Sequence, residues 1–483
     1  MNKKSIGINA VINGGKTMLS VIFPLITFPY ISRILEVDNL GRYNFSHSVI
    51  DYFYLLSSLG IGTYAVREGT RYRNSRKEIS RFTSEVFTIN VFSTVVSYLI
   101  LCLTMLFSDK LHEYASIIMV LSVSMIFTTI GCEWVYTIYE EYLYIAIRTV
   151  VFQIISLILL FVFVREKDDV LWYAAVIVVS NSGANIINLL GLKKYCTIHI
   201  CLNKRIFTHL IPVLVLFANS IATRIYVNSD ITILGFLTSD YNVGIYTIAS
   251  KIYSIAKQVL SAVIIVSIPR LSLLWGQNRK KEYAVLANRI LYILVTFVVP
   301  ASIGMFCLSK EIILVVSTEK FISANTPLRI LCLALLVCLF NWFFTSCILI
   351  PGKKEKYVLL ATAVSALINV ILNFILIPYF EESAAAVTTL VAEACSLIIC
   401  LWNSKDLIKI EIRWKDIIST VVGCAFIYAG CMLIKSFNLT PLICMFSSVA
   451  VSVIGYMCIL LVLKNQSLIS MKDEIGKKIK KKY

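Results

Sequence analysis

The sequence predicts an all-α integral membrane protein. Its composition and the length of its apolar runs lead to that fold class. Hydrophobic residues make up 58% of the 483 residues and charged residues only 15%, whereas soluble globular domains are nearer to about 45–50% apolar and about 25% charged. The apolar runs also continue for about 20 residues without alternating in polarity, which is the length of a membrane-spanning helix and not the pattern of a barrel strand.

Fourteen such runs follow one another along the chain, and we expect each to be a transmembrane helix. The first run follows a basic start that lacks a small-residue cleavage site, which favours a retained span over a signal peptide. The expected spans are 6–31, 43–66, 84–107, 114–138, 142–164, 170–192, 208–236, 243–268, 285–308, 322–350, 356–380, 384–402, 416–435 and 441–463.

The loops between these spans differ in charge, and most Lys and Arg residues fall in alternate loops. The basic segments are 3–4, 67–81, 193–205, 270–281, 353–356, 405–415 and 464–482. The positive-inside rule places them, and both termini, in the cytoplasm, which requires an even number of spans. The net charge of +17 is therefore a sign of topology and not of a nucleic-acid partner. We expect the loop 67–82 to lie along the inner leaflet, next to anionic membrane lipids.

Motifs of enzymes and metal sites are missing from the contexts in which they would function. No HExxH, GxSxG, Walker or GxGxxG pattern stands in a suitable context, and no soluble segment is large enough to bind a nucleotide. The 14 cysteines lie mostly within apolar runs and without zinc-like spacing, which favours small buried thiols. We expect a protein that is not an enzyme and that holds no cofactor.

Two pairs of similar motifs indicate an internal repeat. Gly41-x-Tyr43 matches Gly244-x-Tyr246, and the Glu-Trp at 133–134 matches the Asn-Trp at 341–342. The offsets agree with the span count and predict two six-helix lobes, 1–200 and 201–404, followed by 405–483 with two extra helices and a basic cytoplasmic tail. Paired repeats of this kind place a substrate site at the midplane between the halves, reached by rocking of one half against the other.

The stretch 212–237 is apolar enough to span a bilayer but contains charged residues. A charge near the middle of a span costs about 2.5–3.5 kcal/mol on insertion scales, so we expect a function for it. Helical spacing places Asn219, Thr223, Tyr226 and Asp230 on one face. The first span has a similar polar face, which consists of Asn9, Asn13, Lys16, Ser20 and Thr27.

Central cations outnumber central anions, which predicts a water-filled cavity for an anionic ligand. Lys16, Arg224, Lys251 and Lys257 are the four cations too far from a span end to reach the headgroups. Asn13, Asn219 and Glu133 complete the candidate substrate-binding set. The alternative is internal ion pairing that only holds helices together, for instance of Arg224 with Asp230 or Glu133.

A second polar cluster is rich in oxygen and forms a candidate sodium site. Asn369 and Asn373 lie one turn apart on the eleventh span, Thr388 and Thr389 lie in the twelfth, and Asp230 lies in the seventh. Carboxylate, amide and hydroxyl oxygens suit a hard cation. The alternative is that the two Asn residues join helices by side-chain hydrogen bonds.

Four blocks of the sequence resemble a known family. FPYISRIL (28–35), GRYNF (41–45), LGIGTYAVREG (59–69) and GIYTIASKI (244–252) resemble the polysaccharide-unit flippases, the Wzx-like branch of the multidrug/oligosaccharidyl-lipid/polysaccharide exporter superfamily. The resemblance implies a V-shaped, pseudo-symmetric pair of lobes that works by alternating access. It also implies transfer of an oligosaccharide repeat unit on a prenyl diphosphate of the undecaprenyl type from the inner to the outer leaflet of the bacterial cytoplasmic membrane, for capsule, O-antigen or exopolysaccharide.

The same resemblance bears on coupling and partners. Some members of the superfamily hold sodium in the C-terminal lobe, and Asp230, Asn369, Asn373 and Thr389 match that pattern by position. Asn373 replaces a second carboxylate, which implies a weaker site and leaves coupling to sodium or to protons open. A glycan polymerase of the same pathway is an expected partner.

Three other functions fit parts of the sequence. A lipid II flippase shares the mechanism. A cation-coupled multidrug exporter shares the fold, but its cavity should favour acidic and aromatic residues, which the excess of central cations argues against. A membrane glycan polymerase or ligase would usually carry a large outer loop, and the outer loops here are short.

Overall fold

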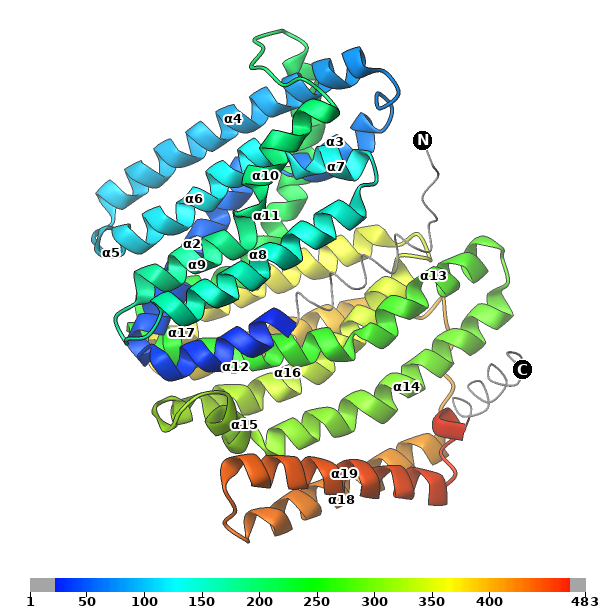
Figure 1. Ribbon diagram of the computed structural model, residues 1–483. Coiled ribbons are helices and arrows are strands. Elements are labelled where there is room, and N and C mark those ends of the chain that lie inside the picture. Colours follow the sequence, from blue (N-terminus) through cyan, green and yellow to red (C-terminus); the bar gives the residue numbers. More distant parts are fainter. Residues whose placement is uncertain (1–21, 470–483) are drawn as a thin grey trace. The chain divides into compact units, whose positions relative to one another are not determined.

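The computed structural model describes residues 22–469 (Figure 1), and all regular secondary structure assigned within that range is helical. The predicted all-α membrane fold is confirmed. In this range ten helices are long and apolar enough to cross a membrane, or up to 11 if the bent pair Asp240–Leu260 and Ala262–Gly276 is one span. Shorter apolar helices are Ile22–Ile34, Ala115–Gly131 and Val227–Leu237. The expected total of fourteen spans stays a prediction.

Contacts divide the chain into two compact units, Met1–Gly244 and Ile245–Tyr483. The predicted lobe boundary at residue 200 stays a prediction. After the helix Ile22–Ile34, the first unit contains α2 (Val37–Ser58), α3 (Ile61–Gly69), α4 (Arg76–Phe107), α5 (Asp109–Glu113), α6 (Ala115–Gly131), α7 (Glu133–Ile138), α8 (Tyr142–Phe163), α9 (Val170–Ser182), α10 (Ala184–Gly191), η1 (Leu192–Lys194) and α11 (Ile206–Leu237).

The second unit contains the larger part of α12 (Asp240–Leu260), a helix that begins in the first unit. The elements that follow are α13 (Ala262–Gly276), α14 (Lys280–Cys307), α15 (Ser309–Val316), η2 (Glu319–Ala324), α16 (Asn325–Phe343), η3 (Phe344–Leu349), α17 (Glu355–Ser404), α18 (Trp414–Lys435) and α19 (Pro441–Val462). Figure 1 shows α18 and α19 side by side as a hairpin, and the Tyr456 hydroxyl fixes this hairpin to α14 by donating to the Thr296 carbonyl at 2.7 Å.

The helix α17 joins two of the expected spans. At about 1.5 Å per residue, its 50 residues would extend over about 75 Å, more than twice the hydrocarbon thickness of about 30 Å. The helix therefore has to turn, and it does so at Glu381, whose φ of 48° is left-handed, three residues after Pro378. Residues 356–380 and 384–402 lie on the two sides of this turn.

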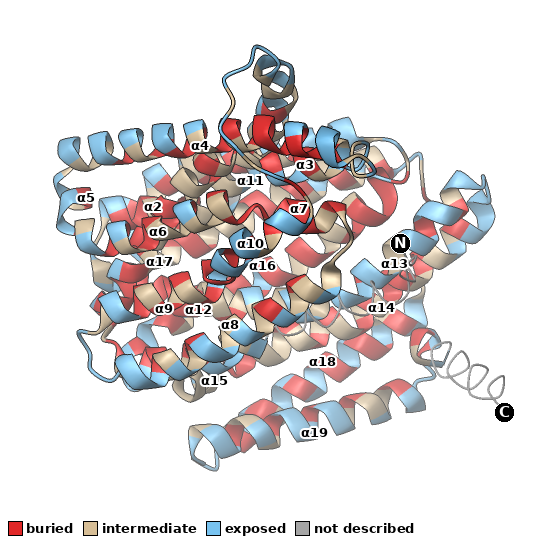
Figure 2. Ribbon diagram, turned by 45° about the horizontal axis from the view of Figure 1, so that its top comes forward, coloured by how far each residue is buried: buried red, intermediate tan, exposed pale blue. Residues whose placement is uncertain are grey.

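Burial follows the membrane pattern in α4. Figure 2 shows this helix with buried residues on one side and exposed residues on the other. The exposed side is apolar and includes Phe92, Leu99 and Leu103, each more than half exposed. The buried side is rich in polar residues, among them Ser84, Thr88 and Ser97. Such an inverted distribution is expected where lipid, and not water, surrounds the helix.

The glycines of the two Gly-x-Tyr motifs of the predicted repeat both belong to the first unit, where the starts of their helices meet. Each glycine is the fifth residue of its helix, Gly41 in α2 and Gly244 in α12. A side chain on Gly41 would collide with the Asp240 carbonyl oxygen, and one on Gly244 would collide with the Val37 carbonyl oxygen. The backbones of the two helix starts approach so closely that only glycine fits. The Arg42 guanidinium adds an ion pair to Asp240 at 3.1 Å.

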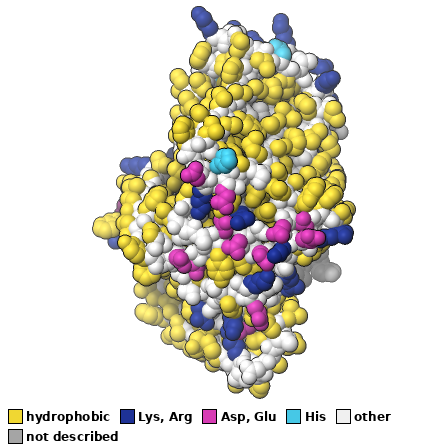
Figure 3. All heavy atoms as spheres, turned by 90° about the vertical axis from the view of Figure 1, so that its left-hand side faces the viewer, with side chains coloured by type: hydrophobic (Ala, Val, Ile, Leu, Met, Phe, Trp, Pro, Cys, Tyr) yellow, Lys and Arg dark blue, Asp and Glu magenta, His cyan; other side chains and the backbone are white. Residues whose placement is uncertain are grey.

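Figure 3 includes the end of the first unit at which α5 lies, and the loop there is expected to be extracytoplasmic. Acidic and basic side chains gather there among hydrophobic side chains. Pairs such as Lys167 with Glu36 and Arg42 with Asp240 illustrate this mixture of signs. This mixture of signs differs from the excess of Lys and Arg in the loops that the sequence predicts to be cytoplasmic.

Candidate functional site

A polar cavity opens between the helices of the first unit. Its volume is about 300 Å³, and its lining comes from α2, α6, α9 and α11. The lining residues are His47, Ile50, Asp51, Tyr54, Leu121, Ser124, Ile177, Val178, Asn181, Ser182 and Arg224. It contains Arg224, one of the four cations that the sequence places at the candidate substrate site.

Asp51 is the centre of the polar contacts in this cavity. Its Oδ2 atom lies 3.6 Å from the Arg224 guanidinium and accepts a hydrogen bond from the Asn228 amide at 2.8 Å. His47 Nδ1 lies 3.8 Å from the same oxygen. One carboxylate thus fixes two side chains of α11, which positions Arg224 at the cavity wall.

The charges in the cavity remain accessible. The Arg224 side chain is 41% exposed, and the Asp51 side chain is 21% exposed. A guanidinium has five N–H donors, and the contact with Asp51 involves one of its nitrogens, at ion-pair distance. The remaining donors can bind a phosphate or carboxylate of a ligand while the contact with Asp51 is kept.

The face that α11 presents to α2 differs from the face expected from the sequence. Arg224, Asn228 and Thr232 lie at helical spacing along the contact, and Thr232 donates to the Ser48 hydroxyl at 2.9 Å. Of the expected stripe, Thr223 is exposed and Asp230 is buried, while the side chains of Asn219 and Tyr226 lie outside the described residues. The sequence offered Asp230 or Glu133 as an ion-pair partner of Arg224, whereas in the structure Arg224 pairs with Asp51.

Glu133 lies in another contact of the first unit. At the start of α7 it forms an ion pair with Arg148 of α8, whose guanidinium also donates to the Ala184 carbonyl at 3.2 Å. Arg148 is buried, and Glu133 remains 45% exposed. This pair joins α7, α8 and α10, which is the helix-joining role that the sequence left open for internal ion pairs.

In the second unit, Lys257 of α12 faces an acid of α17. The Lys257 ammonium lies 3.8 Å from the Glu393 carboxylate and 5.7 Å from the centre of the Tyr253 ring. Glu393 is buried and also accepts a hydrogen bond from the Asn341 amide at 3.3 Å. Lys251 lies six residues earlier on α12 and is partly buried.

The two Asn residues of the candidate sodium site form a hydrogen-bonded network across the turn of α17. Asn373 donates to the Asn369 side-chain oxygen at 3.2 Å and accepts from the Thr388 hydroxyl at 2.5 Å. Thr388 and Thr389 both also donate to the Ala385 carbonyl, at 3.0 and 2.9 Å. The network joins the two halves of α17, so it already provides the helix-joining role of paired Asn residues.

The predicted site residues are therefore distributed over several places. Lys16 and Asn13 precede the described residues, and the side chain of Asn219 is also outside them. Arg224 and Asp230 belong to the first unit, whereas Lys251, Lys257, Asn369, Asn373 and Thr389 belong to the second. Convergence of the cations on one cavity, and a sodium site that combines Asp230 with α17, stay predictions.

Sequence reasoning did not assign a role to His47, Asp51 or Asn181. A signal for the first two was present, because His47, Asp51 and Tyr54 lie at helical spacing within an apolar run. The same pattern identified the polar faces of 212–237 and of the first span.

Family models and relatives match most of the chain. A family model described as "Polysaccharide biosynthesis protein" matches residues 6–275, and one described as "MatE" matches residues 216–375. A protein of Shigella dysenteriae named for O-antigen transport is 22% identical over 83% of this chain and 99% of its own length. The capsular polysaccharide biosynthesis protein CapF of Staphylococcus aureus is 22% identical over 79% of this chain and 94% of its own length.

Solved structures share the fold at lower sequence identity. The lipid II flippase MurJ in an inward closed conformation superimposes with a TM-score of 0.77 at 14% identity, and the match covers 95% of this chain and 100% of that one. A multidrug resistance transporter of the MATE family in an inward-facing conformation gives a TM-score of 0.64 at 13% identity, covering 82% of this chain and 98% of that one. At these identities the likeness shows the fold alone.

Proposed function

Because the chain belongs to the polysaccharide biosynthesis protein family, whose model covers more than half of it, we propose that it is a flippase for a lipid-linked oligosaccharide repeat unit. The cargo is a glycan on a prenyl diphosphate of the undecaprenyl type, moved from the inner to the outer leaflet by alternating access. The product serves the assembly of capsule, O-antigen or another exopolysaccharide. The relatives named for O-antigen transport and capsular polysaccharide biosynthesis, which this chain matches over nearly their whole length, support this choice of cargo.

The observation that carries the proposal is the exposed arginine in the cavity of the first unit. A diphosphate is multiply anionic, and its transfer through hydrocarbon without compensation costs far more than thermal energy. Arg224 supplies a fixed positive charge within the membrane-spanning helices, and Asp51 and Asn228 hold its helix in place. The amide of Asn181 and the hydroxyls of Ser124 and Ser182 provide neutral donors for a sugar or a phosphate oxygen.

The location and partners follow from the same proposal. The protein acts in the bacterial cytoplasmic membrane with both termini in the cytoplasm, as a transporter and not as an enzyme. Lys16, Lys251 and Lys257 complete the anion-binding set, and a glycan polymerase takes up the transferred unit. Coupling to sodium through Asp230 and the polar residues of α17, or to protons, is part of the proposal. An inside-negative potential also helps to move the anion outward, by about 2.3 kcal/mol per charge per 100 mV.

Transport of lipid II is the second candidate function. The chain shares its fold with the lipid II flippase MurJ over 95% of its length, so the fold alone does not separate the two cargoes. Both cargoes share a prenyl diphosphate, so Arg224 would serve either one. The curated relatives with glycan names favour the polysaccharide repeat unit over lipid II. A multidrug exporter is disfavoured by the cation in the cavity.

The test is deletion of the protein in its own host and identification of the lipid-linked glycan that accumulates in the inner leaflet. We expect accumulation of a polysaccharide repeat unit, with loss of the matching surface glycan and normal peptidoglycan. Accumulation of lipid II would establish the second candidate. Normal levels of every lipid-linked glycan, combined with increased sensitivity to cationic drugs, would refute both.

A further inference from the structure

Two cavities lie one after the other along α4 in the first unit, away from the cavity of Arg224. The polar cavity has a volume of about 670 Å³ and is lined by Arg76, Lys77, Ser80, Arg81, Ser84, Glu85, Thr197, His199, Cys201 and Asn203. The apolar cavity has a volume of about 540 Å³ and is lined by Leu56, Leu59, Ile89, Phe92, Ser93, Val96, Leu202, Asn203, Lys204, Ile206, Phe207 and Leu210. Asn203 lines both cavities. On α4, the polar cavity ends at Glu85 and the apolar cavity begins at Ile89, one helical turn later.

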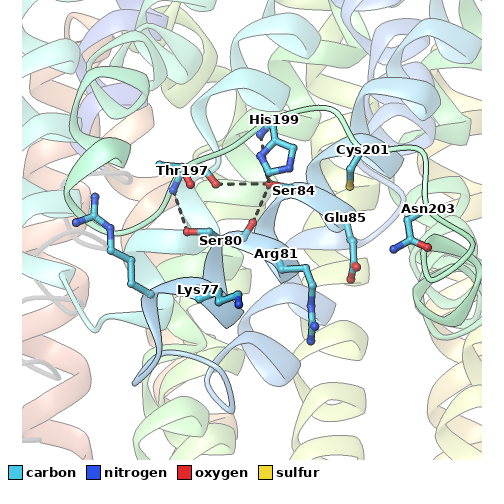
Figure 4. A pocket seen from close by; sticks show the side chains of 10 residues that line it. Lys77, Ser80, Arg81, Ser84, Glu85, Thr197, His199, Cys201 and Asn203 are labelled. Atoms are coloured by element: carbon cyan, nitrogen blue, oxygen red, sulfur yellow. Dashed lines mark hydrogen bonds between the residues drawn. The ribbon is translucent and has the colours of Figure 1, made fainter.

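The wall of the polar cavity is fixed by hydrogen bonds to α4. Figure 4 shows the segment with Thr197, His199 and Cys201 running along the turns that carry Ser80 and Ser84. Three hydroxyls at successive turns of α4 accept from alternate backbone amides of this segment. The bonds run from Thr197 to Ser80 at 3.1 Å, from His199 to Ser84 at 3.3 Å and from Cys201 to Thr88 at 3.0 Å.

The cations of the polar cavity differ from the other cations of the same loop. Arg67 and Arg71 both contact Glu68, and Arg73 pairs with Glu140 at 2.9 Å. Among the described residues, by contrast, Arg76, Lys77 and Arg81 take part in no ion pair, and all three are exposed. Arg76 donates only to a backbone carbonyl, that of Lys193, at 2.9 Å.

The one acid in the lining, Glu85, contacts a histidine and forms no ion pair with these cations among the described residues. Glu85 Oε2 lies 3.0 Å from His209 Nε2, and the Tyr64 hydroxyl contacts the other ring nitrogen at 2.6 Å. The polar cavity thus has three cations without acid partners, which attract an anion. A phosphate would replace the missing partner by charge-assisted hydrogen bonds.

The apolar cavity has the character of a chain-binding groove. Phe92 is 53% exposed, Phe207 is 67% exposed and Leu202 is 82% exposed. The polar side chain of Ser93, in its floor, is satisfied by donating to the Ser57 carbonyl at 2.5 Å. The groove therefore offers mainly hydrocarbon surface, with Asn203 and Lys204 as its exposed polar residues, next to a cavity that offers positive charge.

We propose that the two cavities together bind one anionic phospholipid of the inner leaflet. The phosphate occupies the polar cavity near Lys77 and Arg81, and an acyl chain occupies the apolar cavity between α4 and the start of α11. The order along α4 fits the bilayer, because the polar cavity lies at the N-terminal end of α4, which the charge pattern places in the cytoplasm. Anionic lipids of that leaflet attract basic segments, by about a factor of five per cation. The inference goes beyond the proposed function and does not depend on it.

The test measures binding of dioleoylphosphatidylglycerol to the full-length purified protein by native mass spectrometry. We expect Lys77→Gln/Arg81→Gln to weaken binding at least tenfold, and dioleoylphosphatidylcholine to bind the wild type at least tenfold more weakly. Arg71→Gln is the matched control, because it removes a cation of the same loop outside the cavity, and binding should stay within twofold. Equal affinity for the two lipids, or an unchanged affinity in the double variant, would overturn the proposal.

Four further measurements test the occupant and the fold. Glycerol 3-phosphate should compete weakly, and competition as strong as that of the whole lipid would mean a phosphate site without a lipid. Undecaprenyl diphosphate that displaces phosphatidylglycerol at a much lower concentration would assign the cavities to the transport path and refute the phospholipid. Phe207→Ala should weaken binding severalfold, while the Tm values of all variants in lipid-free detergent should equal that of the wild type.

Discussion

The Arg224 guanidinium of α11 lies 3.6 Å from the Asp51 carboxylate of α2, although 173 positions separate them in sequence. Both side chains line one cavity among membrane-spanning helices. Two roles are compatible with such a pair. Either it only joins the helices, or Asp51 holds Arg224 in position to bind an anion. The two roles differ in what removal of each partner does.

Replacing Arg224 should affect transport more than replacing Asp51. Arg224→Gln removes the positive charge, and a hydrogen bond to a charged group contributes about 1.5–3 kcal/mol, so we expect at least a tenfold loss of surface glycan. Asp51→Asn keeps the hydrogen-bond acceptor for Asn228 and leaves the guanidinium unpaired, so we expect a loss of threefold or less. The measurement is surface glycan at matched protein levels in the membrane.

Arg224→Lys serves as the control for charge alone and should retain part of the activity. If Arg224→Gln and Asp51→Asn reduced glycan equally, and the double variant were no worse than either, the pair would be only a helix joint. Wild-type glycan with Arg224→Gln would remove this cavity from the transport path.

The sequence predicted the fold class because apolar composition and run length depend on the membrane and not on tertiary packing. It also placed the boundary between the expected spans 356–380 and 384–402 at the position where Glu381 interrupts α17, but it did not predict that a single left-handed residue makes this turn. Local pattern specifies that a segment is helical, whereas a left-handed residue that redirects a helix is stabilised by its surroundings.

The candidate site was predicted in part, for a related reason. Arg224 was identifiable as a charge within an apolar run, but Asp51 was not identifiable as its partner. The helix α11 carries polar residues on two faces, one with Thr223 and Asp230 and the other with Asn228 and Thr232. Only contact with α2 determines which face lines the cavity, and contacts between distant segments are not encoded in helical spacing.

A double-mutant cycle should show that Lys257 and Glu393 contribute jointly to the free energy of unfolding. Lys257→Met leaves the buried Glu393 carboxylate with one fewer partner, and we expect a loss of about 1–3 kcal/mol. Adding Glu393→Gln removes that charge and should restore most of the stability. The Tm in detergent reports both effects. If Lys257→Met were as stable as the wild type but reduced surface glycan, Lys257 would act on the cargo and not on Glu393.

Sodium binding should appear as stabilisation that depends on the cation. A ligand that binds the folded state stabilises it by about 2.7 kcal/mol at 100 times its dissociation constant, so we expect a higher Tm in NaCl than in KCl of equal ionic strength. Asp230→Asn should abolish the difference, whereas Asp38→Asn, at an exposed carboxylate, should keep it. Equal Tm values in both salts for the wild type would leave no support for a sodium site.

Asn373 tests the structural role of the network within α17. Asn373→Ala removes the acceptor of the Thr388 hydroxyl and the donor to Asn369, and both partners are buried. Thr388 keeps its bond to the Ala385 carbonyl at 3.0 Å, so the loss is that of two hydrogen bonds, at about 0.5–1.5 kcal/mol each, and the Tm should fall in KCl as well as in NaCl. A decrease confined to NaCl would show instead that Asn373 acts by binding the cation.

Gly41 and Gly62 provide a matched pair of glycine-to-alanine substitutions in neighbouring helices. Gly62→Ala adds a methyl group with nothing within 4 Å, and alanine favours a helix over glycine by about 1 kcal/mol, so stability should be unchanged or increased. Gly41→Ala places the same group against the Asp240 backbone carbonyl, which cannot move without shifting the start of α12. Overpacking of this kind costs about 1–3 kcal/mol, and the shift would also displace Asp240 from Arg42.

We therefore expect a lower Tm for Gly41→Ala only, measured in detergent at equal concentration. Equal Tm values for the two variants would show that α2 and α12 do not approach each other as closely as the glycine contacts indicate.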